Sequence, residues 1–254
     1  MPPEMTNVVA WVTGAGSGIG RACAIALAEA GMRVALSGRR VDRLEAVASE
    51  IAQRGGTTHV EPLDVSHSGA VDASASLIRD RFGPIGVLVY SAGTNQSDRR
   101  WSDTSPSSWR SVTNTNLDGA FYCCRAVLPH MRERGDGLII TVSSWAGHYP
   151  SLLAGVAYSS TKAALNVLTE TINMEEGRHN IRACAIAPAE VNTEILERRP
   201  EPVPQTEREF MLQPEDIGGI VRYLAELPPH VCVNSLIVSP TWNRPYHGPH
   251  RGVG

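Results

Sequence analysis

Lysine is nearly absent from this chain of 254 residues, because Lys162 is the single lysine among 23 basic residues and the others are arginines. Such a bias can reflect the coding genome alone, so the place of the exception matters more than the count. Lys162 stands four residues after Tyr158, in the stretch Tyr158-Ser-Ser-Thr-Lys162. The single lysine is therefore the first candidate for a functional side chain.

An excess of basic residues is also missing: 23 Lys and Arg residues face 26 Asp and Glu residues, for a net charge of −3. Nucleic acids and anionic membranes are bound through clustered positive charge, so we expect neither as a partner. No apolar run approaches the roughly 18 residues of a membrane-spanning helix, and we expect no targeting leader, since no charged-then-apolar segment opens the chain.

The cysteines lack the CxxC or zinc-finger spacings that indicate a metal site, and they are odd in number: Cys23, Cys123, Cys124, Cys184 and Cys232. We expect reduced thiols in a cytoplasmic protein, and no metal. With 42 % apolar and 19 % charged residues, the chain has ample material for a core. One large domain or two small ones would fit its length, and α/β sheets of this size are often single.

A glycine-rich turn stands between a predicted strand and a predicted helix near the N-terminus. Residues 7–13 form a largely apolar run suited to a buried parallel strand, and an alanine-rich helix extends to residue 30. Glycines let the backbone approach a pyrophosphate, and the helix start supplies N–H groups and a favourable dipole. A merely tight turn is the alternative. The candidate phosphate-binding residues are Gly14, Gly16, Ser17, Gly18 and Ile19.

The second predicted strand, residues 33–37, ends at Gly38-Arg39-Arg40. In a dinucleotide-binding fold an acidic residue here would bind a free ribose 2′-hydroxyl, whereas arginine accommodates a 2′-phosphate. Arg39 and Arg40 therefore favour NADP, because guanidinium and phosphate pair bidentately. Two alternatives stay open: NAD, since Ser17 adds no second cation, and a role for both arginines at the start of a helix over 41–53.

Polar or small residues end the next two predicted strands, over 59–63 and 86–90. Asp64 and Val65 follow the first and are positioned to meet an adenine edge, although Asp64 could instead cap a helix over 67–82. Ala92 and Gly93 follow the second, where small residues allow a close approach of a cofactor. These four residues join the candidate cofactor site.

Helices and strands continue to alternate beyond residue 93. A loop over 94–105 precedes a long helix over 106–134, which contains Asn116. Asparagine is unfavourable inside a helix, so Asn116 has either a local backbone bond or a function. A strand over 138–143 delivers Ser144, and a helix over 157–176 and a strand over 181–187 follow.

The C-terminal quarter begins with a proline-rich segment over 189–213, which is typical of a substrate lid because it follows a strand end. A helix over 214–227, a strand over 234–238 and an irregular tail from residue 240 complete the chain. His247 and His250 could hold a metal in principle, but a disordered end is the simpler interpretation.

The spacing of Tyr158 and Lys162 has a chemical meaning on a helix, where positions i and i+4 share one face. A phenol titrates near 10, and a neighbouring ammonium favours the phenolate. A tyrosine beside a lysine can therefore act as a general acid and base near neutral pH. A solvated surface pair is the alternative.

Seven motifs occur in register with this repeat of strands and helices, and with them the chain resembles the short-chain dehydrogenase/reductase family over nearly its whole length. The motifs are Thr13-Gly14-x-x-x-Gly18-x-Gly20, Asp64-Val65, Ser91-Ala92-Gly93, Asn116, Ser144, Tyr158-x-x-x-Lys162 and Pro188…Thr193. The resemblance implies a single Rossmann-type, doubly wound domain with a mostly parallel seven-stranded sheet and helices on both faces. It also implies hydride transfer between a nicotinamide and an alcohol or carbonyl carbon.

The resemblance also implies roles for individual residues. Tyr158 would donate the proton in reduction, Lys162 would bind the nicotinamide ribose and lower the pKa of the phenol, and Ser144 would orient the substrate oxygen. Asn116 would hold a water that links Lys162 to solvent. Further cofactor contacts would come from Arg39, Asp64, Ala92, Gly93, Pro188, Val191 and Thr193. A homodimer or homotetramer is implied as well, through the helices over 106–134 and 157–176.

The chain departs from the family pattern at two strand ends. Tyr90-Ser91 replaces a pair of asparagines whose bonds tie neighbouring strands, and Ala189 replaces the glycine after Pro188, which narrows the space near the nicotinamide. The segment from Ser235 is similar to the branch that acts on small hydroxy acids.

We therefore expect an NADP(H)-dependent oxidoreductase that interconverts a small ketone or aldehyde and its alcohol or hydroxy acid. One alternative is reduction of a 3-oxoacyl group on a carrier protein. Arg99-Arg100 and Arg198-Arg199 are candidates for the basic patch it would need, although solvated arginines are the simpler interpretation. The other alternative, a non-catalytic NADP-sensing module, is disfavoured because both Tyr158 and Lys162 are retained.

Overall fold

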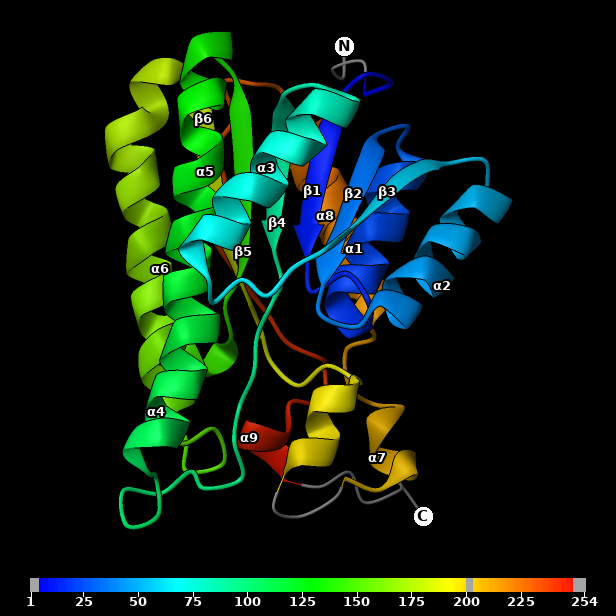
Figure 1. Cartoon of the computed structure of the whole chain (residues 1–254). Helices are drawn as coiled ribbons and strands as arrows, with labels where there is room; N and C mark the ends of the chain where they lie inside the picture. The colour runs from blue at the N-terminus through cyan, green and yellow to red at the C-terminus, as the bar shows by residue number, and fades with distance from the viewer. Residues whose placement is uncertain (1–4, 200–202, 249–254) are drawn as a thin grey trace.

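A single seven-stranded sheet organises the computed structural model, which describes residues 5–199 and 203–248. Its order is β3-β2-β1-β4-β5-β6-β7, and every strand pairing in the described residues is parallel (Figure 1). The strands are β1 (Val9–Thr13), β2 (Arg33–Gly38), β3 (Thr57–Pro62), β4 (Ile85–Tyr90), β5 (Gly137–Val142), β6 (Ile181–Pro188) and β7 (Ser235–Val238). The predicted doubly wound α/β fold is confirmed.

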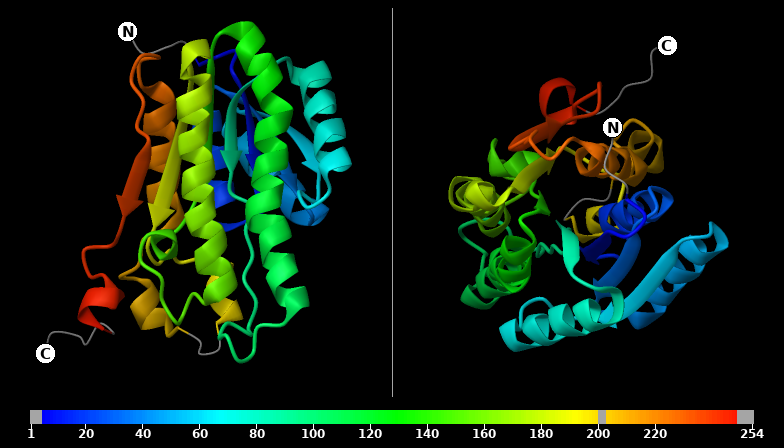
Figure 2. Two further views of the ribbon diagram at one scale, coloured as in Figure 1. Left: turned by 90° about the vertical axis from the view of Figure 1, so that its left-hand side faces the viewer. Right: turned by 90° about the horizontal axis from the view of Figure 1, so that it is seen from above.

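Helices cover both faces of this sheet, so the central strands are buried on both sides and consist largely of apolar residues (Figure 2). One core layer lies under α1, α2 and α8, and the other lies under α3, α5 and α6. The helices are α1 (Gly18–Glu29), α2 (Val41–Gln53), α3 (Ser68–Phe82), α4 (Pro106–Thr113), α5 (Gly119–Arg134), α6 (Val156–Glu176), α7 (Gln205–Arg208), α8 (Pro214–Glu226) and α9 (Arg244–His247). No helix within the described ranges is both long and apolar enough to cross a membrane.

The order of the strands reverses at β1, which lies between β2 and β4. In open parallel sheets a ligand binds in the crevice outside the carboxyl ends of the strands at such a point. Thr13, Ser91 and Ala92 meet there, because the backbone N–H groups of Ser91 and Ala92 both donate to the Thr13 hydroxyl, each at 3.2 Å. The fold therefore brings the glycine turn and the end of β4 to one place.

The long helix predicted over 106–134 is interrupted. A π-helical turn over Asn114–Asp118 separates α4 from α5, and Asn116 lies in it. Wider turns of this kind occur frequently at functional sites. Asn116 is thus accommodated by a local change of helix type.

Tyr90, which stands where the family pattern has an asparagine, makes a hydrogen bond of its own to a neighbouring segment. Its hydroxyl donates to the carbonyl oxygen of Thr115, at the π-helical turn. Gly119 makes room for this, because a Cβ at that position would lie 2.5 Å from the Tyr90 hydroxyl. Tyr90 and Gly119 therefore tie β4 to the start of α5 as a matched pair.

The segment over 189–213 contains more order than the proline-rich sequence suggests. It includes a 3-10 helix over Glu194–Arg198, the short helix α7 and a bridge between Val191 and Leu212. Leu196, Val203 and Met211 form a small apolar cluster of their own. Figure 1 shows α7 and α9 beyond the carboxyl ends of the strands, on the side where the crevice opens.

The tail predicted as irregular from residue 240 also differs from the structure in one respect, since Arg244–His247 form α9. His247 stacks on Trp242 with ring centroids 4.9 Å apart, and His250 lies outside the described residues. Within those residues, no three His, Cys, Asp or Glu side chains gather as a metal site would require.

Candidate functional site

The glycine turn has the geometry of a cradle for a phosphate group. Gly14 and Gly18 adopt φ angles of +66° and +51°, a region that glycine occupies without strain. A Cβ on Gly14 would lie 2.8 Å from the carbonyl oxygen of Ser91, and one on Gly20 would collide with the carbonyl oxygen of Gly14. Helix α1 begins at Gly18, and Ser17 precedes it without a side-chain cap, so no capping side chain satisfies the first N–H groups of the helix. A dinucleotide pyrophosphate fits this arrangement.

Arg40 reaches back over the glycine turn. Its Nη2 donates to the Ser17 hydroxyl at 3.1 Å and pairs with the carboxylate of Glu194 at 3.1 Å. Arg43 approaches the other oxygen of Glu194 at 3.8 Å. Arg40 occupies the position before α2 but makes no capping bond with its side chain. The guanidinium therefore lies where the sequence predicts a phosphate partner, and it holds an acidic side chain from the segment over 189–213.

Asp64 does not cap the helix that follows, because α3 begins at Ser68 and His67 holds the capping position. The Asp64 carboxylate accepts instead from the backbone N–H and the hydroxyl of Ser66, at 3.0 Å and 2.7 Å. Burial raises its pKa, but these hydrogen bonds and the charge of Arg39 outweigh burial and lower the pKa overall. The capping alternative is wrong, and Asp64 is an ionised group beside Arg39.

The remaining predicted cofactor residues line the same side of the molecule but differ in exposure. Val65 and Val191 are buried, at 5 % and 6 % exposure, and Val65 packs against Gly119. Gly93 is exposed, whereas Ala92 and Thr193 are half-buried and Pro188 is buried. The Thr193 methyl group meets the glycine turn, since a Cβ on Gly18 would lie 2.9 Å from it.

Ser144 begins a single 3-10 turn over Trp145–Gly147 directly after β5. Its hydroxyl accepts from the backbone N–H of Ala146 at 3.1 Å. The preceding residue, Ser143, donates to the carbonyl oxygen of Lys162 at 3.0 Å. The end of β5 is thus fastened to α6, the helix that carries Tyr158.

Lys162 is almost fully buried, at 3 % exposure, and its Nζ donates to the carbonyl oxygen of Val142 at 2.7 Å. The same Nζ lies 5.6 Å from the centre of the Tyr158 ring and 3.6 Å from where a Cβ on Gly93 would stand. Burial lowers the pKa of Lys162 to about 8. The solvated-pair alternative is therefore wrong for Lys162.

The pKa of Tyr158 is raised above its ordinary value, and burial is the largest cause. Hydrogen bonding with Ser144 lowers it, as do the charges of Arg99 and Arg199. The sequence predicted that Lys162 would lower this pKa, whereas the groups that lower it in the structure are Ser144, Arg99 and Arg199. The Nζ of Lys162 is directed to the carbonyl oxygen of Val142. The cations that act on the phenol come from two other segments.

Asn116 is fully buried and joins three segments. Its Oδ1 accepts from the backbone N–H of Thr94 at 2.8 Å, and its Nδ2 donates to the Thr94 carbonyl at 3.0 Å and to the Thr161 hydroxyl at 3.2 Å. The alternative of a local backbone bond is wrong, since Thr94 is 22 positions away. Asn116 fixes the loop after β4 against α6, next to Gly93 and Lys162.

Arg99 and Arg199 were predicted to be solvated, and the structure contradicts this for both. Arg99 is 8 % exposed, and its Nε and Nη1 donate to the carbonyl oxygens of Gln96 and Leu153, each at 2.7 Å. Arg199 pairs with Glu190 at 2.6 Å, and both side chains are 13 % exposed. A surface patch for a carrier protein cannot include buried Arg99. Nothing in the local sequence distinguishes Arg99 from exposed Arg100, so only the fold reveals its place.

Aromatic side chains from the C-terminal segment reach the same area, which the sequence did not predict. The ring of Tyr246 in α9 lies 5.6 Å from that of Trp145, next to Ser144, and Tyr149 lies 4.7 Å from Trp145 on another side. The segment over 240–248 therefore forms part of the rim around Ser144 and Tyr158.

Proteins of similar sequence point to one family for this chain. A profile of the short chain dehydrogenase family matches residues 8–203. An uncharacterized oxidoreductase of Staphylococcus aureus (strain MRSA252) is 34 % identical over 236 residues, which are 93 % of this chain and 98 % of that protein. Another, from Staphylococcus haemolyticus (strain JCSC1435), is 32 % identical over 93 % of this chain and 99 % of its own length.

Solved structures of similar fold include oxidoreductases of the same kind. The X-ray structure of an alcohol dehydrogenase from the archaeon Thermococcus sibiricus, complexed with 5-hydroxy-NADP, has a TM-score of 0.84 and 32 % identity, over 94 % of this chain and 98 % of that one. A metagenomic short-chain oxidoreductase in complex with NADP has a TM-score of 0.82 and 31 % identity, over 94 % and 99 % of the two chains. This chain belongs to the short-chain dehydrogenase family of oxidoreductases.

Proposed function

We propose that this oxidoreductase uses NADP(H) to interconvert a small ketone or aldehyde and its alcohol or hydroxy acid. The observation that carries the proposal is a half-buried Tyr158, whose pKa is lowered by hydrogen bonding with Ser144, beside buried Lys162, whose Nζ lies 5.6 Å from the centre of the Tyr158 ring. These three side chains stand on the carboxyl side of the sheet, where the cradle for a dinucleotide also lies. Proton handling and cofactor binding are thereby adjacent.

The glycine turn, Arg39, Arg40 and Asp64 would hold the adenosine half of the cofactor, and Gly93, Lys162, Pro188 and Thr193 would hold the nicotinamide half. When bound, the cofactor supplies or removes the hydride, which is chemistry that no side chain provides. NADP rather than NAD is favoured by Arg39 and Arg40, because guanidinium groups pair with a 2′-phosphate. The NADP complexes of two structural relatives support this choice.

Tyr158 would transfer the proton in this reaction. In reduction, the carbonyl carbon gains a hydride, the electron pair of the C=O bond moves to oxygen, and the phenol proton passes to that oxygen. Ser144 would hold the same oxygen by donating a hydrogen bond. Because burial raises the pKa of Tyr158, the phenol is protonated at neutral pH and is ready to donate. Oxidation would reverse each transfer, with the phenolate as base.

Lys162 and Asn116 would act around this centre. A protonated Lys162 would bind the nicotinamide ribose and supply positive charge near the phenol while it loses its proton. Asn116 would hold the loop after β4 in place and position a water that links Lys162 to solvent. The segment over 189–213 would serve as the lid over the substrate.

A homodimer or homotetramer is part of the proposal. Large apolar side chains on α5 and α6 are exposed, with Phe121 at 52 %, Val167 at 65 % and Met174 at 75 %. Burial of such side chains against a second copy is a common use of exposed apolar faces. Light scattering coupled to size exclusion tests this, and a monomeric mass would refute it. A cytoplasmic location also stays a prediction.

Oxidation of NADPH, followed by its absorbance with a panel of ketones, aldehydes and oxo acids, tests the main proposal. Tyr158→Phe keeps the ring but removes the proton, so turnover should fall by about 10²–10⁴-fold. Quenching of protein fluorescence by NADPH should be retained in the same variant. Full activity in Tyr158→Phe would remove the phenol from the mechanism.

A further inference from the structure

Three aromatic side chains form a cluster that begins at the residue after Ser144. The ring centre of Trp145, the first residue of the 3-10 turn, lies 4.7 Å from that of Tyr149 and 5.6 Å from that of Tyr246. Tyr149 and Tyr246 are still 51 % and 67 % exposed despite these contacts. Contiguous exposed apolar surface commonly marks a binding site. The three side chains together, here called the aromatic wall, therefore have surface left for a ligand.

Close backbone packing places this wall against the helix of the proposed proton donor. A Cβ on Gly147, in the same 3-10 turn, would lie 2.8 Å from the carbonyl group of Lys162, so the turn packs directly on α6. The backbone N–H of Tyr149 donates to the carbonyl oxygen of Trp145 at 2.8 Å, which fixes the two residues relative to each other. The turn that carries Trp145 therefore meets α6 about one helical turn from Tyr158.

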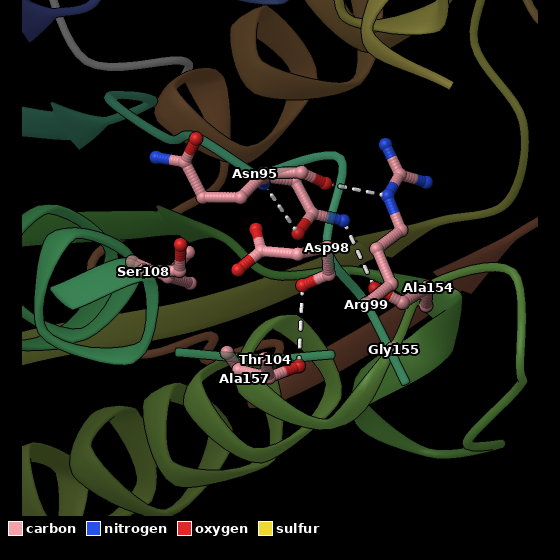
Figure 3. Close-up of a pocket in the computed structure, with 10 residues that line it drawn as sticks. Asn95, Asp98, Arg99, Thr104, Ser108, Ala154, Gly155 and Ala157 are labelled. Carbon is pink, nitrogen blue, oxygen red and sulfur yellow. Dashed lines mark hydrogen bonds between the residues drawn. The ribbon is translucent and has the colours of Figure 1, made fainter. Parts of the chain in front are cut away.

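The loop after β4 holds the other end of the segment that joins this turn to α6. The side-chain amide of Asn95 donates to the carbonyl oxygen of Ala154 at 2.9 Å (Figure 3). The carbonyl oxygen of Arg99 accepts from the backbone N–H of Val156, the first residue of α6, at 3.2 Å. The segment is thus fastened at both ends, which limits the movement of Tyr149 within it.

Ion pairs hold α9, which carries Tyr246, against the segment after β6. Arg244 lies 3.4 Å from one carboxylate oxygen of Glu190 and 2.9 Å from the carboxylate of Glu207. The other oxygen of Glu190 pairs with Arg199 at 2.6 Å. All four side chains are a quarter exposed or less, so salt and water screen these pairs only in part. Tyr246 therefore reaches the wall from a segment that is anchored by contacts of its own.

We propose that the substrate carries a large apolar substituent, an aryl group or a ring of similar size, and that the aromatic wall binds it while Ser144 and Tyr158 hold the reacting oxygen. One molecule can reach both, because Trp145 is the residue next to Ser144. The rings offer faces and edges for stacking but no positive charge, so they favour an apolar substituent over an anionic one. This inference rests on the proposed function and narrows its substrate class to carbonyl compounds and alcohols with such a group.

Matched methyl ketones test the inference. The compounds 2-butanone, 4-cyclohexyl-2-butanone and 4-phenyl-2-butanone share the reacting group and differ at the far carbon, where a ring is not conjugated with the carbonyl. Wild-type kcat/KM should rise by about 10- to 100-fold from 2-butanone to the phenyl ketone, because an apolar pocket discriminates by about this factor. The cyclohexyl ketone should lie between them, since it is buried but does not stack. Equal or lower kcat/KM for both ring-bearing ketones would overturn the inference.

Variants then identify the wall. Tyr246→Ala should lower the ratio of kcat/KM for the phenyl ketone to that for 2-butanone by about 5- to 20-fold, whereas Tyr246→Phe, which keeps the ring, should retain it. Tyr149→Ala should act in the same direction. Arg244→Met, which frees α9, should lower the ratio by a smaller factor and leave the Kd for NADPH as in the wild type. Tyr223→Ala is the matched control and should leave the ratio unchanged, because Tyr223 is 60 % exposed on α8, at the opposite face of the sheet from α6.

The outcomes separate this inference from the proposed function. If the wild type prefers ring-bearing ketones but Tyr246→Ala and Tyr149→Ala retain the preference, the wall does not bind the substituent and the inference fails. If these variants lower the molar mass in light scattering and leave the ratio unchanged, the wall is an interface between copies of the chain, and the inference fails as well. In both cases the proposed function stands. If no carbonyl compound is consumed with either cofactor, the proposed function fails and this inference with it.

Discussion

The cofactor side of the molecule and the rim around the substrate are built by different means. On the side proposed to bind the cofactor, positive φ angles at Gly14 and Gly18 and the missing Cβ atom of Gly20 define the shape, so the backbone itself forms the cradle. At the rim, Arg99 is held by the carbonyl oxygen of Leu153, 54 positions away, and Arg199 by the carboxylate of Glu190, nine positions away. A site formed by the backbone can therefore be predicted from a short sequence motif, whereas a site that depends on contacts between side chains of different segments cannot.

Among variants that test the difference between these two regions, Lys162→Arg is expected to have the largest effect on turnover. The charge is retained, but Lys162 is only 3 % exposed and its Nζ lies 2.7 Å from the carbonyl oxygen of Val142, which leaves a planar guanidinium no equivalent place. Turnover should fall by about 10²-fold while circular dichroism and the thermal midpoint stay near wild type. Wild-type turnover would show that any cation serves at this position.

The next largest effect is expected in the pH dependence of turnover, through the titration of Lys162. Burial lowers the pKa of Lys162 to about 8, so the side chain is charged below that pH and neutral above it. If the charged form is required, the rate of reduction should be level below about pH 8 and fall by about tenfold per unit above it. Residual activity of Lys162→Arg should show no such break, since arginine stays charged. A wild-type rate that rises above pH 8 would contradict a requirement for the ammonium.

The variant Arg40→Gln tests whether Arg40 binds the 2′-phosphate of NADPH. Loss of one charge-assisted pair should raise the Kd for NADPH by about tenfold and change the Kd for NADH little, as measured by fluorescence titration. Arg39→Gln, in parallel, shows which of the two adjacent arginines carries the preference. Tighter binding of NADH than NADPH by the wild type would refute the NADP assignment.

Glu194→Gln probes the one described ion pair that joins the lid segment to Arg40, and the smallest effect is expected here. The two side chains are 52 % and 45 % exposed, and exposed pairs contribute about 0.2–1 kcal/mol. Because Glu194 shares Arg40 with an incoming phosphate, its loss should lower the Kd for NADPH by up to about fivefold. Glu197→Gln on the same 3-10 helix is the matched control. Weaker binding in Glu194→Gln would mean that the carboxylate supports the cofactor instead of competing with it.

Much of the fold could be predicted, because strands buried on both faces leave continuous apolar runs and glycine marks the turns between layers. The alternation of strands and helices and the approach of the glycine turn to the end of β4 follow from those signals. The meeting of Tyr158, Lys162 and Ser144 was expected from their motifs, and they lie together in the structure. Their catalytic roles stay predictions.

The missed features depend on contacts that no local pattern encodes. The π-helical turn at Asn116 forms because Thr94 and Thr161 supply partners for its amide. Arg99 is buried because Gly155 has no Cβ and lets the backbone of Arg99 pack closely against it, while Arg100 in the same loop is exposed. Likewise α9 forms against Trp145, which lies about a hundred positions earlier.

The pairing of Tyr90 with Gly119 also constrains how this chain can have diverged from its relatives. A Cβ at position 119 would lie 2.5 Å from the Tyr90 hydroxyl and 2.8 Å from Cγ2 of Val65, so a larger residue there requires both neighbours to shift. Among related chains, a tyrosine at position 90 is therefore expected to occur together with glycine at position 119.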